Sequence, residues 1–442
     1  MSNKNNEQPQ LTIASKSNLW FYPGEKLEDG QMRVTLMGTG WGNVVSPVQK
    51  GPSIFVELGN KAKDSFVFDV GPGCILNYNA MNIPMSRMNK IFISHLHMDH
   101  CSDLPFIYSF GPNLGDRFKA LDIYGPSGPN LLDKNGDKTD TTLGIRNMVK
   151  GMIQFTQWHT TSFKTMTEGA EESYNLKGHV HELDYRLCGA IAYHSGEKGK
   201  ENDHVIIRHF PAVHIIDGAI SYRLEWSPVG TTEYFSLVYS GDTLPSDFML
   251  EYGKNADLMI HETAPSIDSI MNGAGSSEEN AYAIVCNSHT PANSLGSILA
   301  KTKPKLGVTT HSPMDPRSIE DLITGVRKGI FSAKDSDGER IHDPEQAYQV
   351  GADFMVFNIG KDSENETVIT TRMATAIERP WPVRVAKTKA APPLSKKDIA
   401  YYKSASAEAS INPSLNTRIF GHVNNSDQCQ AYEDSEKSTN DK

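Results

Sequence analysis

The sequence feature that most constrains the fold is a cluster of metal-binding side chains directly after a short apolar run. Residues 91–93 read Ile-Phe-Ile, and residues 94–100 read Ser-His-Leu-His-Met-Asp-His. Three histidines and one aspartate within six residues are costly in a hydrophobic core and have little use on a surface. At a strand end, alternate side chains of an opening loop can converge on one point. The pattern therefore predicts a metal site at the end of a β-strand.

Four further polar residues occupy the same kind of position elsewhere in the chain. Each follows an apolar run that is typical of a strand, and the four are His214, Asp242, His261 and His311. A single histidine at a strand end is more often an ordinary loop residue than a ligand. Four such residues beside the His-rich loop favour one shared site, because sites of layered α/β folds collect at the carboxyl ends of strands.

Composition limits the class of protein to which the chain can belong. Its 442 residues are 38% hydrophobic and 22% charged, which is enough apolar material for a sizeable core. The formal net charge of −10 disfavours nucleic-acid binding but permits a small anionic substrate, because a bound metal can invert the local charge. The five cysteines are scattered without CxxC spacing, which excludes a disulfide framework and a zinc ribbon.

Neither membrane insertion nor a signal peptide is indicated. No apolar run reaches the ~20 residues that a spanning helix needs, so we expect no membrane partner. The first ten residues, MSNKNNEQPQ, lack the apolar segment of a signal peptide. We therefore expect a cytoplasmic protein, or an exported one whose leader has already been removed.

The chain divides into three parts by composition. We predict a polar N-terminal arm (1–30), one folded domain (31–374) and a Pro- and Ser-rich C-terminal extension (375–442) that is partly disordered. Within the domain, short strands alternate with helices, two of which are predicted at 277–287 and 317–330. Residues from about 130 to 205 are rich in Gly, Lys, Asp and Glu and are predicted to form an insertion of loops and short helices.

The order of these motifs resembles that of the metallo-β-lactamase-fold metallohydrolases. The resemblance spans residues 32–374 and rests on the HxHxDH motif at 95–100, His214, Gly-Asp-Thr at 241–243 and Thr-His at 310–311. It is strongest toward the branch of ribonuclease Z, cyclic-nucleotide phosphodiesterases and zinc-dependent arylsulfatases. A weaker resemblance links the chain to hydrolases of natural-product clusters such as guanitoxin biosynthesis. The family implies a four-layer αββα fold of the α/β class, here with the insertion before the third histidine motif and with a C-terminal extension.

The same resemblance implies two divalent metal ions, zinc in the first place and iron or manganese as alternatives. The ligands implied by motif position are His95, His97 and His214 for one ion, Asp99, His100 and His311 for the other, and Asp242 as a bridge. Asp69, before the Gly-Pro-Gly turn, is expected to orient the HxHxDH loop. Two such ions can activate a shared water for hydrolysis and stabilise charge on a phosphoryl or sulfuryl oxygen. The implied activity is that of a metal-dependent hydrolase of ester bonds.

Two further elements are candidates for proton transfer. His289 precedes His311 by 22 residues in Ser-His-Thr-Pro, where the ribonuclease Z branch has a His-Ser-Thr element. His261-Glu262-Thr263-Ala264 resembles the His-Glu-Ala-Thr element of that branch. We expect His289 to act as the general acid, His261 and Glu262 to orient it, and Asp99 to take part in catalysis besides binding metal. A buried, backbone-bonded histidine at position 261 is the alternative.

Motif spacing bears on the substrate. Bacterial ribonuclease Z inserts its tRNA-clamping arm between the third histidine motif and the Gly-Asp motif, but only 28 residues separate His214 from Asp242. We therefore expect a small anionic phosphodiester or sulfate ester as substrate, with nucleic acid disfavoured and a homodimer compatible. The alternatives are a ribonuclease Z-like tRNA 3′-processing endonuclease, a thioester hydrolase of the glyoxalase II type, and a non-catalytic RNA-binding member.

The insertion contains aromatic residues that need an explanation. Residues 151–163 read GMIQFTQWHTTSF, and Trp158 and His159 are candidates for a lid over the substrate. The alternative is that these aromatic side chains pack the insertion onto the core. A basic face on the insertion would support an RNA-binding function, whereas a closed pocket lined by Trp158 would oppose it.

Overall fold

The computed structural model describes residues 20–42, 48–114, 117–128, 143–196, 204–215, 217–231, 233–341 and 346–375. Most of the predicted N-terminal arm and all but the first residue of the predicted C-terminal extension lie outside this range, as do 129–142 and 197–203 of the predicted insertion. In the part that is described, no helix is long and apolar enough to cross a membrane.

The first sheet has nine strands among the described residues. In sheet order they are β1 (Trp20–Phe21), β16 (Thr367–Ala374), β15 (Met355–Lys361), β2 (Met32–Gly38), β3 (Ser53–Leu58), β4 (Ser65–Phe68), β5 (Lys90–Phe92), β6 (Asp122–Pro126) and β7 (Val180–Leu183). The strands from β4 to β7 are parallel, so their carboxyl ends open on the same edge. That edge carries the HxHxDH loop, which directly follows β5.

The second sheet has seven strands within the described ranges. In sheet order they are β14 (Tyr348–Val350), β13 (Leu306–Thr310), β12 (Leu258–Glu262), β11 (Phe235–Tyr239), β10 (Ile220–Ser227), β9 (His204–Pro211) and β8 (Ala190–Ser195). The strands from β11 to β14 are parallel. Asp242 and His311 therefore follow strands that end on one edge of this sheet.

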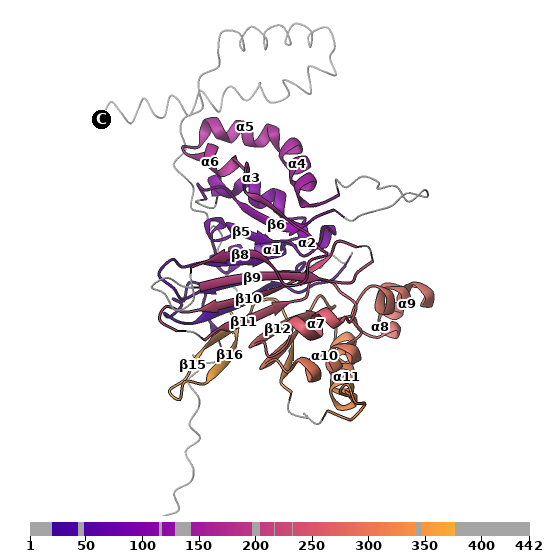
Figure 1. The fold of residues 1–442 in the computed structure, drawn as a ribbon. Coiled ribbons are helices and arrows are strands. Elements are labelled where there is room, and N and C mark those ends of the chain that lie inside the picture. The colour runs from indigo at the N-terminus through magenta and orange to yellow at the C-terminus, as the bar shows by residue number, and fades with distance from the viewer. Residues whose placement is uncertain are drawn as a thin grey trace, which may run out of the picture. The chain divides into compact units, whose positions relative to one another are not determined.

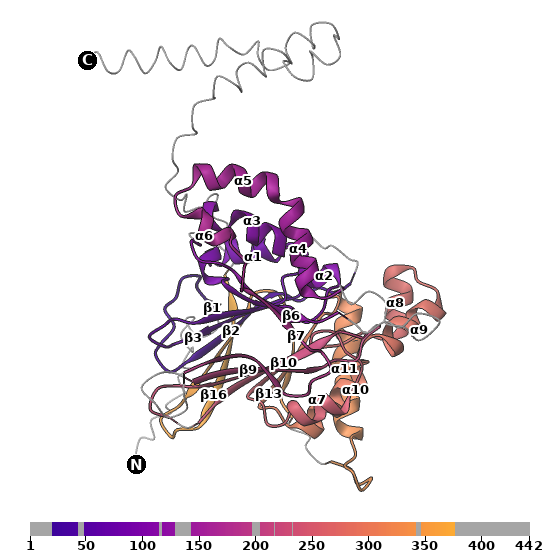
Figure 2. The ribbon, with the colours of Figure 1, turned by 45° about the horizontal axis from the view of Figure 1, so that its top comes forward.

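The two sheets pack face to face around an apolar core (Figure 2). Phe68 of β4 packs against Tyr222 of β10, with ring centroids 5.5 Å apart, and Phe92 of β5 packs against the same tyrosine at 5.7 Å. Val34, Ile260 and Val308, which are almost fully buried, belong to the same cluster. Strands that are buried on both faces read as continuous apolar runs, which is why β2, β4 and β12 are recognisable in the sequence.

Helices cover the outer face of each sheet (Figure 1). The helices, with one 3-10 turn (η2), are α1 (Cys74–Ala80), η2 (Met85–Arg87), α2 (Met98–Cys101), α3 (Leu104–Leu114), α4 (Ile145–Phe155), α5 (Gln157–Met166), α6 (Ala170–Tyr174), α7 (Asp247–Tyr252), α8 (Ile267–Ala274), α9 (Glu278–Asn287), α10 (Ala292–Thr302) and α11 (Pro316–Ser332). Apolar residues of α1, α3 and α4 pack on the first sheet, and those of α7, α10 and α11 pack on the second. The predicted four-layer α/β fold is confirmed.

The sequence predicts the helix starts well and the edge strands poorly. Ser277 caps α9 by accepting a hydrogen bond from the Asn280 backbone, and Asp315 caps α11 in the same way. The predicted insertion was expected to contain loops and short helices only. Its described part also contains β7 and β8, each an edge strand of one sheet. Both strands are largely half-exposed and contain polar residues, and β8 has only a four-residue apolar run that is followed by His194 and Ser195, so neither was recognised as a strand in the sequence.

Candidate metal centre

The Asp69 carboxylate anchors the HxHxDH loop. It accepts hydrogen bonds from the Ser94 backbone N–H at 2.7 Å and the Ser94 hydroxyl at 2.6 Å. His100 Nδ1 and the Tyr239 hydroxyl each lie 2.7 Å from the second carboxylate oxygen. Asp69 is fully buried and follows β4, so these contacts join the ends of β4, β5 and β11. They leave His100 Nε2 directed away from Asp69 and available to a ligand.

Two glycines allow the backbone segments of this region to approach closely. A Cβ at Gly71, in the Gly-Pro-Gly turn after Asp69, would collide with the Asp99 carbonyl. Gly241 has φ +57°, and a Cβ there would lie 2.6 Å from Cβ of Ser94. Only glycine combines this left-handed conformation with so close an approach. The Gly-Asp-Thr sequence therefore places Asp242 directly beside the HxHxDH loop.

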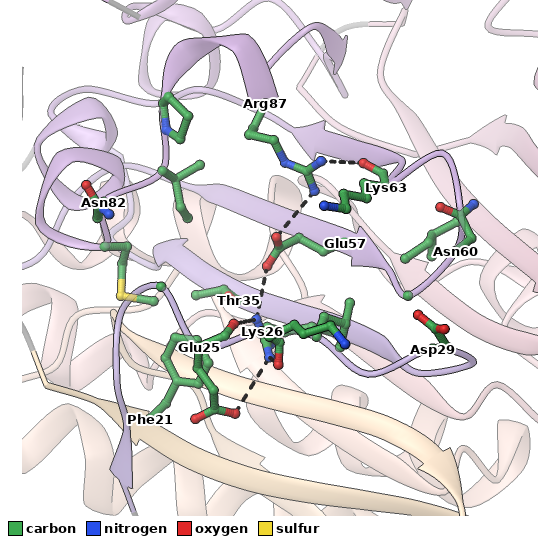
Figure 3. A pocket seen from close by; sticks show the side chains of 18 residues that line it. Phe21, Glu25, Lys26, Asp29, Thr35, Glu57, Asn60, Lys63, Asn82 and Arg87 are labelled. Carbon is green, nitrogen blue, oxygen red and sulfur yellow. Dashed lines mark hydrogen bonds and ion pairs between the residues drawn. The ribbon is translucent and has the colours of Figure 1, made fainter. Parts of the chain in front are cut away.

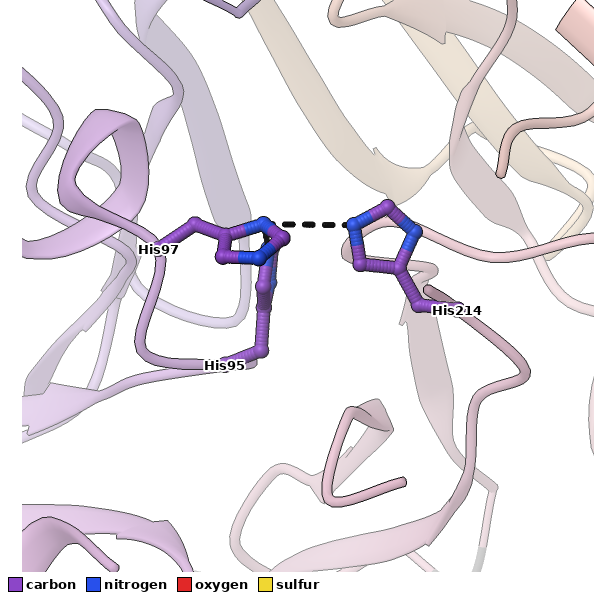
Figure 4. Close-up of side chains that lie close together, drawn as sticks. All are labelled: His95, His97 and His214. Carbon is purple, nitrogen blue, oxygen red and sulfur yellow. Dashed lines mark hydrogen bonds between the residues drawn. The ribbon is translucent and has the colours of Figure 1, made fainter. Parts of the chain in front are cut away.

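Three histidines converge at one end of the site (Figure 4). His97 Nδ1 lies 3.0 Å from His95 Nε2 and 3.2 Å from His214 Nε2. His214 Nδ1 donates a hydrogen bond to the Ser288 carbonyl at 2.7 Å, which leaves the Nε2 lone pair facing its neighbours. Burial lowers the pKa of all three imidazoles below the usual value. Neutral imidazole is the form that binds a metal ion.

A second cluster contains two carboxylates and two histidines, namely Asp99, His100, Asp242 and His311. His311 Nε2 lies 3.2 Å from Asp99 Oδ2, and His100 Nε2 lies 3.2 Å from Asp242 Oδ1. His100 Nε2 and Asp242 Oδ1 are both buried and have no hydrogen-bond partner among the described residues. A buried polar atom without a partner costs about 1–3 kcal/mol, and a cation between these two atoms would satisfy both. The residues therefore fit a divalent metal.

Asp242 lies between the two clusters. Its Oδ2 atom is 3.8 Å from His95 Nε2, 3.8 Å from His214 Nε2 and 3.4 Å from His311 Nε2. The side chain is 2% exposed, so its charge is shielded from water and acts on its neighbours at short range. One carboxylate can thus reach metal sites on both sides.

His289 borders both clusters and is held by Glu262. Its Nδ1 atom lies 3.1 Å from Glu262 Oε1 and 3.8 Å from Asp242 Oδ2. Glu262 also accepts a hydrogen bond from the Thr243 backbone at 2.9 Å, which fixes the carboxylate. Burial alone would lower the pKa of His289, but the Glu262 carboxylate raises it to about 9. His261 is fully buried, and its Nδ1 donates to the Glu262 carbonyl at 2.6 Å.

The comparisons with known proteins agree with this site. No protein-family model matches the chain. Ribonuclease Z of Thermococcus kodakarensis is 26% identical over 236 residues, which are 52% of this chain and 72% of that protein. Ribonuclease Z of Prochlorococcus marinus is 27% identical over 299 residues, 64% of this chain and 88% of that protein. The metallo-β-lactamase fold protein YhfI from Bacillus subtilis superimposes with a TM-score of 0.45 at 16% identity, covering 74% of this chain and 99% of that one.

Two observations point to the same kind of protein. The chain is similar in sequence to ribonuclease Z, and its HxHxDH, His, Gly-Asp and Thr-His motifs meet at one site in the structure. The chain is a metal-dependent hydrolase. It acts on ester bonds, and its sequence is similar to the metallo-β-lactamase-fold hydrolases of the branch that contains ribonuclease Z.

Two residues near the centre of this hydrolase were missed by the sequence analysis. The Gly42 backbone donates a hydrogen bond to Asp99 Oδ2 at 3.1 Å. The Trp41 ring meets the His289 ring edge-on at 6.1 Å and the His311 ring at 6.3 Å. The signal was present in Gly-Thr-Gly-Trp-Gly at 38–42, where the glycines mark a close approach of the backbone.

The metal centre of the hydrolase opens into a cavity of about 110 Å³. His95, His97 and His214 form one wall, and Leu143 and Asp217 contribute to the rest. The lid candidates do not line this cavity. His159 packs 4.5 Å from both the Phe110 and the Phe163 rings, and Trp158 is 84% exposed.

A larger cavity of about 540 Å³ lies at the other end of β2 and β3 (Figure 3). Four of its charged side chains form ion pairs with one another. Arg33 lies 3.6 Å from Glu57 and 3.7 Å from Glu25, and Arg87 lies 3.3 Å from Glu57. Arg33 is near the start of β2, whereas the residues that contact Asp99 follow its end, so this cavity is separate from the metal centre of the hydrolase.

Proposed function

We propose that the chain hydrolyses a phosphodiester bond of RNA, as its ribonuclease Z relatives do, with two zinc ions bound by seven side chains. The proposed ligands are His95, His97 and His214 for one ion, Asp99, His100 and His311 for the other, and Asp242 between them. The observation that carries the proposal is the position of the Asp242 carboxylate within 3.8 Å of histidines from both clusters. Imidazole and carboxylate ligands suit zinc, and iron or manganese would be accepted by the same set.

In this proposal each remaining residue has a defined task. The bound ions would supply an activated water and neutralise charge on the phosphoryl oxygens. Asp69 holds His100 in one tautomer, and the Ser288 carbonyl does the same for His214. Glu262 holds His289 through Nδ1, which leaves Nε2 free to protonate the departing oxygen. Trp41 closes one side of the centre against the rings of His289 and His311.

A second candidate substrate is a small anionic phosphodiester or sulfate ester. It is favoured by the short interval between His214 and Asp242, because that interval contains β10 and β11, which pair with each other, while β10 also pairs with β9. No separate tRNA-clamping arm is formed there by the described residues. The ribonuclease Z similarity supports the RNA substrate more strongly than the small-molecule substrate expected from the sequence.

The first test is metal content together with turnover of three substrates. We expect two metal ions per chain and cleavage of bis(4-nitrophenyl) phosphate and of a tRNA transcript with a 3′ extension, but not of 4-nitrophenyl sulfate. Asp242→Ala should lose both ions and all turnover, because it removes a carboxylate that lies within 3.8 Å of histidines from both clusters. A matched change at Asp217, which lines the cavity outside the clusters, should keep both ions.

Three results would decide against parts of this proposal. An Asp242→Ala variant that retains two ions would exclude Asp242 as a bridge. Cleavage of the diester without cleavage of RNA would favour the small-molecule substrate. Preference for the sulfate would place the enzyme with the arylsulfatases.

A further inference from the structure

The helices α4 and α5 expose both aromatic and basic side chains. Phe155 is 70% exposed and Trp158 is 84% exposed. Arg146, Lys150 and Lys164 on the same two helices are also exposed. We call these five residues the α4–α5 face. Exposed aromatic residues of this size need a reason in a stable domain, because large apolar side chains in water usually mark a binding surface.

This face is positively charged in an acidic protein. Residues 145–167 contain three Lys or Arg residues and no Asp or Glu, although the whole chain has a net charge of −10. The acidic residues nearest along the chain are Asp140 before α4 and Glu168, Glu171 and Glu172 after α5. In space, the Glu182 carboxylate of β7 accepts a hydrogen bond from the Arg146 backbone N–H at 3.3 Å, so the positive charge is local to the two helices. The local excess of positive charge favours an anionic partner.

Core packing holds the face in place. Ile145, Val149 and Met152 of α4 are buried in the cluster beneath the first sheet. The Thr156 hydroxyl, between the helices, donates to the Met152 carbonyl at 2.7 Å, and His159 Nε2 donates to the Ser109 carbonyl at 3.1 Å. Phe155 and Trp158 are therefore presented to solvent by a fixed scaffold.

The face begins at the metal centre and leads away from it. Leu143 lines the metal-centre cavity, and α4 starts two residues later. At 1.5 Å per residue the eleven residues of α4 span about 16 Å. Asp99 and His100 belong to α2. Figures 1 and 2 show that α4 leads from the neighbourhood of α2 toward α5, and that α5 lies on the side of α3 that faces away from the sheets. A ligand that reaches from the cavity to Trp158 must be several nucleotides long.

We propose that the α4–α5 face is an RNA-docking surface, on which unpaired bases stack on Phe155 and Trp158 while Arg146, Lys150 and Lys164 bind phosphates. This inference rests on the proposed RNA phosphodiesterase function and adds the substrate-binding surface to it. Aromatic rings flanked by cations are the usual platform for single-stranded nucleic acid, because every base offers a ring face. A second copy of the chain fits less well, since a two-fold interface would set three positive charges against three more.

The test compares matched surface variants in the full chain. One variant is Phe155→Ala with Trp158→Ala, another is Lys150→Glu with Lys164→Glu, and the control is Phe331→Ala with Lys328→Glu on α11, where both side chains are exposed. The readouts are Kd for a fluorescent tRNA transcript with a single-stranded 3′ extension, measured on metal-free protein, KM for the same RNA, and kcat/KM for bis(4-nitrophenyl) phosphate.

We expect both face variants to raise Kd and KM for the RNA about tenfold or more. The charge variant should also reduce the slope of log Kd against log salt by about 1.5. Turnover of bis(4-nitrophenyl) phosphate should stay within about twofold of wild type, because the small ester reaches only the metal centre. The α11 control should match wild type in every readout.

The outcomes separate this inference from the proposed function. Cleavage of RNA with unchanged Kd and KM in both face variants would overturn the docking surface and leave the function intact. A wild type that cleaves the small diester but neither binds nor cleaves RNA would overturn the docking surface and restrict the function to small esters. A change in sedimentation of the aromatic variant would identify the face as a subunit interface, and binding to anionic phosphatidylserine vesicles in place of RNA would identify a lipid surface. Either of these two results would also overturn the proposal.

Discussion

At the scale of single residues, His289 is the side chain whose role is most open to experiment. Its Nδ1 is held by Glu262, and it lies 3.8 Å from the Asp242 carboxylate. If it protonates the leaving group, His289→Ala should keep two metal ions and lose about 10²–10⁴ in kcat for RNA. The loss should be small for bis(4-nitrophenyl) phosphate, because 4-nitrophenolate leaves without a proton.

The decisive experiment measures the metal content of the variant together with its kcat for the two substrates, which differ in their leaving groups. Glu262→Gln, which keeps the hydrogen bond but removes the charge, is the matched control and should show an intermediate loss. Loss of a metal ion from His289→Ala would instead make His289 a ligand, since one of its ring nitrogens lies within 4.8 Å of a His214 ring nitrogen and an Asp242 carboxylate oxygen.

His209 on β9 gives the molecule a pH-dependent stability. It is 2% exposed, and its Nδ1 has no hydrogen-bond partner among the described residues. Burial lowers the pKa of His209 to about 4, and Asp184 offsets only part of that effect. In the unfolded chain His209 binds a proton as the pH falls below about 6.5, whereas in the folded chain it stays neutral. Its contribution to the free energy of unfolding is therefore fully present above pH 6.5 and is lost as the pH falls toward 4.

The variant His209→Gln isolates this contribution. Between pH 7 and pH 5 the wild type should lose about 2 kcal/mol more unfolding free energy than the variant, measured by urea denaturation. The matched control is His194→Gln, the same substitution at an exposed position on the neighbouring strand β8. Parallel losses in wild type and His209→Gln would mean that His209 is protonated in the folded protein.

The residues of the candidate metal site could be predicted from the sequence because their signal is local. His95, His97, Asp99 and His100 lie within six residues of one another, and the other proposed ligands follow apolar runs. The supporting contacts could not be predicted, because each joins distant segments through the backbone. The Gly42 N–H meets Asp99, and the Ser288 carbonyl meets His214, only after segments 57 and 74 residues apart in the chain have come together.

At the scale of elements, α10 and α11 pack closely enough that their backbones meet. A Cβ at Gly296 of α10 would collide with the Val326 carbonyl and lie 2.7 Å from the Ile330 nitrogen. Gly296→Ala should therefore destabilise the protein by about 1–3 kcal/mol despite the better helix propensity of alanine. Denaturant titration measures the change.

Gly151 in α4 is the matched control for that prediction. A Cβ there would meet no atom within 4 Å. Gly151→Ala should stabilise the protein by about 0.5–1 kcal/mol, because alanine costs less backbone entropy in a helix. Equal effects of the two substitutions would mean that the α10–α11 contact is looser than described.

The edge strands show why part of the fold could not be predicted. In β8 the exposed fraction varies without strict alternation, and its pairing with β9 shifts between Ile191 and Tyr193. Such a strand is defined by its neighbour and not by its own hydrophobic pattern. Helices α9 and α11 could be predicted because their caps and apolar spacing are local.

At the scale of the whole molecule, the metal centre joins the two sheets. The HxHxDH loop follows β5 of the first sheet, whereas His214, Asp242 and His311 follow β9, β11 and β13 of the second. Metal ions bound by both sets would stabilise the folded state by mass action. Adding EDTA should therefore lower the Tm of wild type by about 5 °C or more, measured by calorimetry.

Asp242→Ala provides the control for metal removal. Its Tm should start lower than that of wild type and should not respond to EDTA. An unchanged Tm of wild type after the metal has been removed would show that the core between the sheets is sufficient to hold them together.

The first and last strands of the described chain are neighbours. Trp20 pairs with Met373 and Phe21 with Ala374, and the Thr375 backbone donates to the Phe21 carbonyl at 2.9 Å. Between residues 20 and 375 the backbone thus ends beside the place where it begins. A short linker from residue 375 to residue 20, with new termini opened at the exposed turn around Lys61, would give a circular permutant that keeps every strand pairing.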